Sequence, residues 1–168
     1  YDPERDFTPV SQVNSYEFVL AVAQAVPVRE LSHLLAWLRA NPEKATFGVP
    51  ATGSLPHFFA LMTGERAKVR AEVVGYRGSA PLVTDLIGGE VPVAFDTLEG
   101  MLPQHETGKL RVLAVSGARR SRFAPDIPTF REAGLDLVAS GWNTFFAPAT
   151  MPADRVEQYA TLIREAMQ

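Results

Sequence analysis

The sequence predicts an α/β fold with a mainly parallel sheet flanked by helices. Short apolar runs of strand length alternate along the chain with segments whose apolar residues recur at helical spacing, a pattern typical of βαβ units. With 168 residues, 46% of them hydrophobic, the chain can bury one substantial core but not two full domains. One α/β lobe is therefore expected.

The first half of the chain supplies three of the expected strands. Its expected elements are, in order, a strand at 18–23, a helix at 28–41, a strand at 46–49, a helix at 54–63 and a strand at 69–76. The run 18–23 is short and rich in branched side chains, as buried strands are. Asn41-Pro42 ends the first helix and Pro50 ends the second strand. The opening residues are expected to form a polar turn.

The second half continues the alternation and then loses it. Its expected elements are a helix at 79–87, a strand at 91–95, a helix at 98–105, a strand at 110–116, a short helix at 129–133, an aromatic-rich strand at 138–146 and a last helix at 154–168. Gly88-Gly89 is a typical helix end. The last helix has no C-terminal cap, and the chain does not begin with methionine, so both ends are expected to be cut.

Composition and motifs argue against several functions. The net charge is -3 and the pI is about 5.6, without the basic stripe that nucleic-acid binding requires. No cysteine is present, which excludes disulfides and thiolate catalysis. No glycine-rich phosphate motif and no histidine pair with metal-ligand spacing occurs, so no cofactor and no metal are expected. The sequence also has no apolar run long enough to cross a bilayer.

Three strand-to-helix junctions carry the candidate ligand-binding residues. In open α/β sheets, ligands lie at the carboxyl ends of the strands, where helix N-termini present unpaired amides. The candidates are Thr52, Gly53, Ser54 and His57 at the first junction, Tyr76, Arg77, Gly78, Ser79 and Ala80 at the second, and Asp96 and Thr97 at the third. Helix capping alone is the competing explanation for the hydroxyls and for the carboxylate, and Arg77 is open to interpretation as a surface charge.

A hydrolytic site is the enzymatic alternative. Ser54 and His57 lie one helical turn apart and could pair with Asp96 as a catalytic set. No Gly-x-Ser-x-Gly elbow supports this set, and no catalytic residue is expected. The other two histidines, His33 and His105, are expected on the surface.

The chain resembles the solute receptors of tripartite tricarboxylate transporters, also called Bug receptors. The resemblance rests on the order and spacing of these segments: YDPERDFTPV at 1–10, GVPATGS at 48–54 with His57, YRGSAP at 76–81, DLIGG at 85–89, LAVS at 113–116, RRS at 119–121, PDIPT at 125–129, EAG at 132–134, Trp142 and AP at 147–148. Ala51 departs from the family, which commonly has glycine there.

The resemblance implies a type II periplasmic binding protein, which closes around its ligand like a hinge. In this chain, 1–12 would enter from a first lobe that is absent, 13–146 would be the second, ligand-binding lobe with an antiparallel hinge strand, and 147–168 would be a truncated returning helix. The implied function is capture of a small carboxylate for membrane permease subunits, in the periplasm, by a protein that is not an enzyme and is monomeric at full length. With half the cleft missing, weak binding or none is expected.

Two other functions remain open at this point. The effector-binding domain of a LysR-type transcription regulator shares the type II architecture, and a DNA-binding segment before the lobe would identify it. A small α/β hydrolase that uses Ser54 and His57 is the third possibility.

Overall fold

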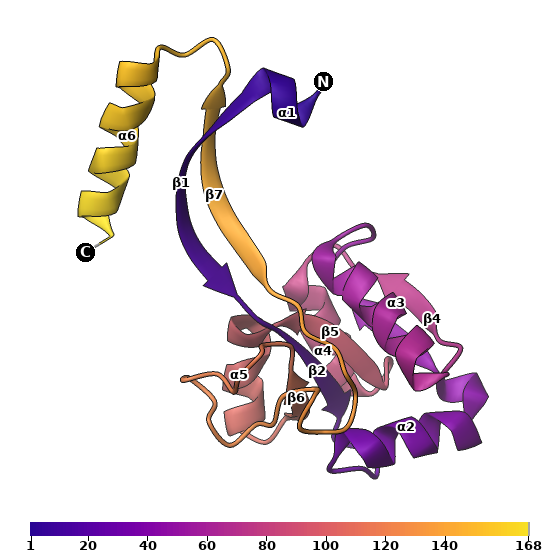
Figure 1. Cartoon of the computed structure of the whole chain (residues 1–168). Helices are drawn as coiled ribbons and strands as arrows, with labels where there is room; N and C mark the ends of the chain where they lie inside the picture. Colours follow the sequence, from indigo (N-terminus) through magenta and orange to yellow (C-terminus); the bar gives the residue numbers. More distant parts are fainter. Residues whose placement is uncertain (168) are drawn as a thin grey trace. The chain divides into compact units, whose positions relative to one another are not determined.

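The computed structural model describes residues 1–167, which form two compact units (Figure 1). Unit 1 combines Tyr1–Tyr16 with the segment from Gly141 onward, and unit 2 is Glu17–Ser140. The second lobe expected from the sequence, 13–146, is a few residues longer than unit 2 at each end. The difference arises because the two strands of unit 1 pair with each other up to these boundaries.

Unit 2 is built around a five-stranded sheet with the order β4-β3-β5-β2-β6. Its strands are β2 (Phe18–Ala23), β3 (Thr46–Val49), β4 (Glu72–Gly75), β5 (Val93–Thr97) and β6 (Leu110–Val115). Strand β3 is parallel to β4 and β5, whereas β2 is antiparallel to β5 and β6. Four strands therefore run in one direction and β2 runs against them, which confirms a mainly parallel sheet with one antiparallel strand.

Helices cover both faces of this sheet. They are α2 (Leu31–Ala40), α3 (Leu55–Ala67), α4 (Ser79–Gly88) and α5 (Leu98–Glu106). Phe47 of β3 contacts Gly64 of α3, and the next residue, Gly48, faces Leu82 of α4. Because successive strand residues point to opposite faces, α3 and α4 lie on opposite sides of the sheet.

A cluster of buried phenylalanines fixes α3 on the sheet. The Phe59 ring lies 5.9 Å from Phe18, 6.0 Å from Phe95 and 5.0 Å from Phe130, measured between ring centroids. All four side chains are almost completely buried. The Phe95 and Phe130 contacts are edge-to-face, a geometry that contributes about 0.5–1.5 kcal/mol beyond the buried area. The N-terminus of α3 is thereby held at one edge of the sheet.

Several element boundaries differ from those expected. Helix α3 continues to Ala67, four residues beyond the expected end, and stops where Lys68 adopts a left-handed conformation with φ of 54°. Strand β5 extends through Thr97, so that Asp96 lies within the strand and does not follow it. The pairing of Asp96 with Val19 of β2 and of Thr97 with Phe18 extends the strand, and a short apolar run does not reveal such pairing.

The short helix expected at 129–133 does not form. These residues make turns, and Thr129 bridges to Val115 of β6. Thr129 and Glu132 exchange the two hydrogen bonds of a helix capping box, at 2.8 and 3.1 Å. The chain nevertheless turns away at Gly134, whose φ is 89°. The capping hydrogen bonds therefore form, but the residues after them make a single turn and no helix.

Unit 1 is an antiparallel ribbon with two helices. It comprises α1 (Pro3–Asp6), β1 (Phe7–Tyr16), β7 (Gly141–Pro148) and α6 (Ala153–Ala166), which contacts β1. The expectation of a polar turn at the start is wrong, because the opening residues form α1 and then a ten-residue strand. Its partner β7 is more than 120 residues away in sequence, so local patterns do not reveal the pairing. The expected last helix is α6, and Gln168 lies outside the described residues.

Candidate functional site

Three loops lie at the same edge of the unit 2 sheet. They follow β3, β4 and β5, which are neighbours and run parallel, so that their carboxyl ends meet at one edge. Backbone hydrogen bonds of 2.8 Å join the first two loops, from Tyr76 N–H to the Val49 carbonyl and from Gly78 N–H to the Pro50 carbonyl. The loops that contain Gly53 and Gly78 are therefore adjacent, as expected from the sequence.

The first loop, 50–54, uses most of its polar groups internally. The Gly53 N–H donates to Nδ1 of His57 at 2.8 Å. The Ser54 hydroxyl donates to the Ala51 carbonyl at 2.7 Å and accepts from the His57 N–H at 3.4 Å, which makes Ser54 the N-cap of α3. Because the Ser54 proton points to a carbonyl and the imidazole takes a backbone N–H, this pair is arranged as a cap and not as a nucleophile with its base.

Thr52 does not cap the helix, because it packs on β4. A Cβ added to Gly75 would overlap Oγ1 of Thr52 and would lie 2.9 Å from the Thr52 backbone nitrogen. Gly75 therefore permits the loops after β3 and β4 to approach each other closely. Gly75 was not among the candidates chosen from the sequence. A glycine at the end of a strand is the signal that could have revealed it.

Tyr76 begins the second loop and is held by α4. Its ring lies over Gly48, and its hydroxyl is hydrogen-bonded to Asp85. Burial, this hydrogen bond and the charges of Asp85 and Glu90 raise the pKa of Tyr76 to about 12. The phenol is therefore protonated across the physiological range and forms a neutral wall of the site. Asp85 is a second residue that was not among the candidates chosen from the sequence.

Asp96 lies at the end of β5, between the first turns of two helices. It is 1% exposed, and its Oδ1 accepts the Thr97 N–H at 2.7 Å. The Ser79 hydroxyl of α4 is an additional neighbour that favours the charged form, but burial is the larger effect and raises the pKa of Asp96. Gly100 of α5 lies against the same carboxylate, since a Cβ added there would be 3.7 Å from Oδ2.

The N-termini of α4 and α5 have no side-chain cap. The α4 N-cap is Gly78, whose φ of 107° suits glycine, and no side chain bonds to the helix end. The N–H groups of Ser79 and Ala80 therefore lack an intrahelical acceptor. At α5, Thr97 is the N-cap but its hydroxyl does not cap, and the Leu98 N–H donates to the Glu17 carbonyl. This leaves the amides of Glu99 and Gly100 as the next donors of that helix.

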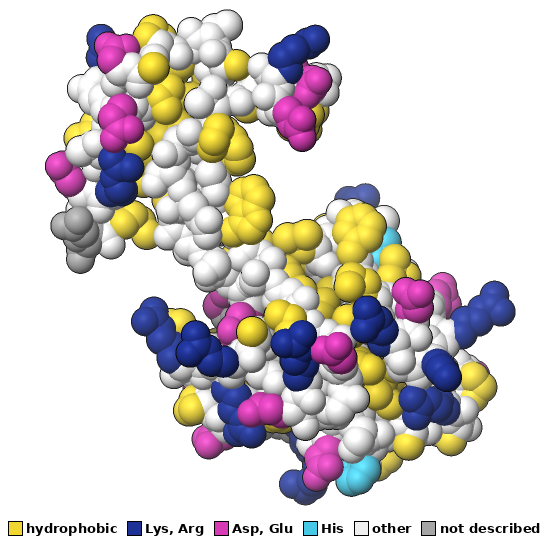
Figure 2. All heavy atoms as spheres, in the orientation of Figure 1, with side chains coloured by type: hydrophobic (Ala, Val, Ile, Leu, Met, Phe, Trp, Pro, Cys, Tyr) yellow, Lys and Arg dark blue, Asp and Glu magenta, His cyan; other side chains and the backbone are white. Residues whose placement is uncertain are grey.

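The second loop carries one basic side chain, Arg77. Arg77 is exposed, which agrees with its interpretation as a surface charge. Over the face of unit 2 drawn in Figure 2, basic and acidic side chains are interspersed and form no basic patch. Among residues 1–167, no three His, Cys, Asp or Glu side chains group as metal ligands, and no helix is long and apolar enough to cross a membrane.

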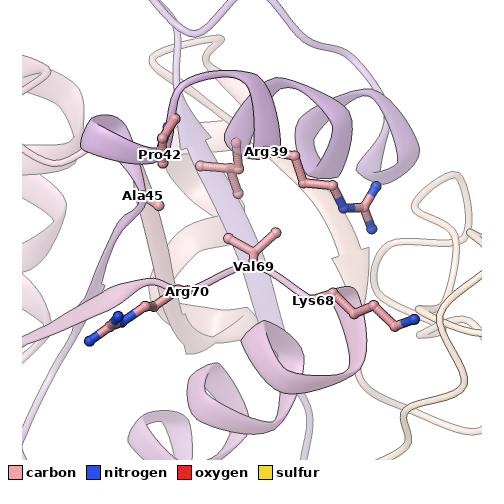
Figure 3. Close-up of a pocket in the computed structure, with 7 residues that line it drawn as sticks. Arg39, Pro42, Ala45, Lys68, Val69 and Arg70 are labelled. Atoms are coloured by element: carbon pink, nitrogen blue, oxygen red, sulfur yellow. The ribbon is translucent and has the colours of Figure 1, made fainter.

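A separate hollow lies near the start of β3 and β4. Its volume is about 210 Å³, and Leu38, Arg39, Pro42, Ala45, Lys68, Val69 and Arg70 line it. Its cationic side chains suggest an anion site, but in Figure 3 Arg70 extends to the opposite side from Arg39 and Lys68. The Arg39 guanidinium already has a hydrogen-bond partner within the chain, because it donates to the Ala67 carbonyl at 2.6 and 3.1 Å. The converging loops are therefore the stronger candidate.

A family model and curated relatives assign the chain to the same protein family. A model described as tripartite tricarboxylate transporter family receptor matches residues 1–168. A UPF0065 protein of Bordetella bronchiseptica is 34% identical over 154 residues, which are 92% of this chain and 45% of that protein. Protein BugT of Bordetella pertussis is 31% identical over 169 residues, which are 100% of this chain and 52% of that protein. The chain spans about half the length of the curated relatives it matches.

Solved structures support the same assignment. R. palustris Rpa4515 with adipate has a TM-score of 0.89 and 32% identity, over 97% of this chain and 55% of that one. MatC from Rhodopseudomonas palustris with bound malate has a TM-score of 0.89 and 26% identity, over 99% of this chain and 57% of that one. These likenesses confirm the periplasmic-binding-protein fold and do not support the regulator or the hydrolase. The chain belongs to the tripartite tricarboxylate transporter receptor family.

Proposed function

We propose that unit 2 supplies one side of a binding site for a small carboxylate, within a receptor that serves an uptake system and is not an enzyme. The observation that carries the proposal is the pair of uncapped helix N-termini, α4 and α5, at the edge where three loops meet. Unpaired amides and the positive end of the helix dipole favour an anion there. The adipate and malate in the two solved relatives support this ligand class.

The affinity of such a site depends on how many helix N-termini point at the same ligand. One helix N-terminus stabilises an anion by about 0.3–2 kcal/mol, and a hydrogen bond to a charged group by about 1.5–3 kcal/mol. Most of the stabilisation from two open helix ends with two donors each is offset by the free-energy cost of association, so that reversible capture is expected. Neutral donors of this kind suit a receptor that must release its ligand to a transporter.

We propose the remaining parts of the function by extension from the family. The receptor would work in the periplasm, as a monomer, and deliver its ligand to membrane permease subunits. The contacts of the facing first lobe would come from the part of the relatives' length that this chain does not span. Binding by the 168-residue chain alone is then weak, because a facing lobe both adds contacts and excludes water.

Two variants of Ser79 test whether its backbone N–H contributes to ligand binding. Ser79→Pro removes the first N–H of α4 at the helix position that accepts proline best, and Ser79→Ala keeps this N–H and removes only the hydroxyl. We expect malate affinity, measured by NMR titration, to fall about tenfold or more in Ser79→Pro relative to Ser79→Ala, since a hydrogen bond to a charge is lost. Equal affinities would refute the role of the α4 N-terminus.

A further inference from the structure

One oxygen of the buried Asp96 carboxylate has no hydrogen-bond partner. Oδ1 accepts the Thr97 N–H, but Oδ2 is enclosed and meets no donor with hydrogen-bond geometry in the described part of the chain. Its neighbours are the Ser79 hydroxyl at the start of α4 and the Gly100 backbone in the first turn of α5. A buried, unpaired carboxylate oxygen is costly, and here it lies between the two helix ends that would hold an anion.

The strands and the helix closest to this carboxylate supply no compensating cation. On α5 the nearest charged group is Glu99, which repels it. Strands β2 and β3, which flank β5, contain no titratable side chain between Phe18 and Ala23 or between Thr46 and Val49.

The neighbouring helices and the segment before β2 offer no compensation either. Asp85 of α4 is occupied by Tyr76, and His57 of α3 accepts from Gly53. The Glu17 carboxylate lies against Gly117. Within residues 1–167, the one charged group that acts on the Asp96 carboxylate is thus Glu99, an acid.

Resting on the proposed function, we propose that capture of a carboxylate at the N-termini of α4 and α5 is coupled to uptake of a proton by Asp96. An arriving anion adds a second negative charge to a site where Asp96 already competes for the same helix ends. Like charges that share a site cannot both be held at low cost. A proton on Oδ2 removes the repulsion, and it also lowers the cost of burying an oxygen that has no hydrogen-bond partner.

The proposed coupling predicts the direction in which carboxylate affinity changes with pH. Burial already raises the pKa of Asp96, and a bound anion would raise it further. Affinity should therefore decrease as the pH rises from the pKa of the free site toward that of the occupied site. One linked proton gives at most about a tenfold loss of affinity for each unit of pH.

The decisive experiment compares the wild-type chain with Asp96→Asn, which keeps the shape and removes the charge. Malate affinity is measured by NMR titration of both proteins between about pH 5 and pH 8. Malate itself titrates at the acid end, so the ratio of the two affinities is the informative quantity. Asp126→Asn, at an exposed position outside the site, is the matched control for loss of one negative charge.

We expect the affinity of the wild type, relative to Asp96→Asn, to fall several-fold as the pH rises, with the Asp126→Asn protein following the wild type. A ratio that stays constant with pH, while malate binds to both, overturns the proton coupling and leaves the proposed function standing. Because binding by this chain alone is expected to be weak, both titrations extend to about 100 mM ligand, a concentration that detects even millimolar dissociation constants. Absence of malate and adipate binding to the wild type at every pH under these conditions overturns the proposed function and this inference with it.

A second measurement uses only the wild-type protein and so does not depend on whether Asp96→Asn folds. The side-chain carboxyl carbon of Asp96 is titrated by NMR with and without saturating malate. An upward shift of its midpoint on malate binding supports the coupling. An unchanged or lower midpoint overturns it.

Discussion

Gly75 leaves no room for a methyl group, and this makes the packing between the first two loops testable. In Gly75→Ala the new Cβ would overlap Thr52 Oγ1 and would lie 2.9 Å from the Thr52 nitrogen and 3.2 Å from its Cβ. Ordinary contacts begin at about 3.4 Å, so the backbone of the first loop, and not only a side chain, must move. We expect the substitution to displace the loop that α3 and its cap hold in place.

The size of the effect follows from two opposing contributions. Overpacking of this kind costs about 1–3 kcal/mol. Replacing glycine by alanine in a strand returns about 0.5–1 kcal/mol of conformational entropy. The net loss in the free energy of unfolding should therefore be about 1–2 kcal/mol.

Urea denaturation followed by circular dichroism measures this loss. Gly88→Ala is the control, because Gly88 is helical, has no positive φ and has nothing within 4 Å of an added Cβ. That variant should be as stable as the wild type or more stable. Thr52→Ala combined with Gly75→Ala should recover part of the loss, since Oγ1 is the closest obstacle. Gly75→Ala as stable as Gly88→Ala would refute the close packing of the two loops.

Three further predictions concern single side chains of the site. His57→Ala should accelerate hydrogen exchange of the Gly53 amide while lowering the free energy of unfolding by less than about 1.5 kcal/mol, because one exposed hydrogen bond is lost; unchanged exchange would contradict it. Ser54→Ala should lower the free energy of unfolding in urea by about 1 kcal/mol, because the N-cap of α3 is lost. Ser54→Asn should retain most of the wild-type stability, since asparagine also caps helices. Equal stability of the two variants would contradict the capping role of Ser54. Asp96 should make the folded state less stable as the pH rises from the unfolded pKa of about 3.9 to its higher folded pKa, because the folded state binds the proton more tightly. The difference in unfolding free energy between Asp96→Asn and the wild type should grow over that window and then level off, and a difference independent of pH would refute it.

Much of the fold could be predicted because the central strands are buried on both faces. Strand β2 is a continuous apolar run, and β5 and β6 contain apolar runs at 93–95 and 112–115; such runs are visible in a sequence. Strand β1 was missed because its sequence is largely polar and its partner lies far along the chain. The false helix at 129–133 shows the converse, since a true capping box was present without the residues to continue the helix.

The sequence allowed the position of the candidate site in the fold to be predicted, but not the hydrogen bonds within it. The rule that loops meet at the carboxyl ends of parallel strands located all three junctions. It could not reveal that His57 would accept from Gly53, or that Thr52 would pack on Gly75, because these contacts depend on how loops from separate strands fit together. For the same reason the sequence suggested a cap or ligand contact for Asp96, whereas the structure buries its second oxygen without a partner.

The most direct test of the central claim is an amide chemical-shift map of malate binding to the 168-residue chain. We predict that the N–H signals of Ser79 and Gly100 shift together and fit one dissociation constant, because both belong to open helix ends at the same edge. Shifts confined to Lys68 and Arg70, beside the basic hollow near the start of β3, would contradict it.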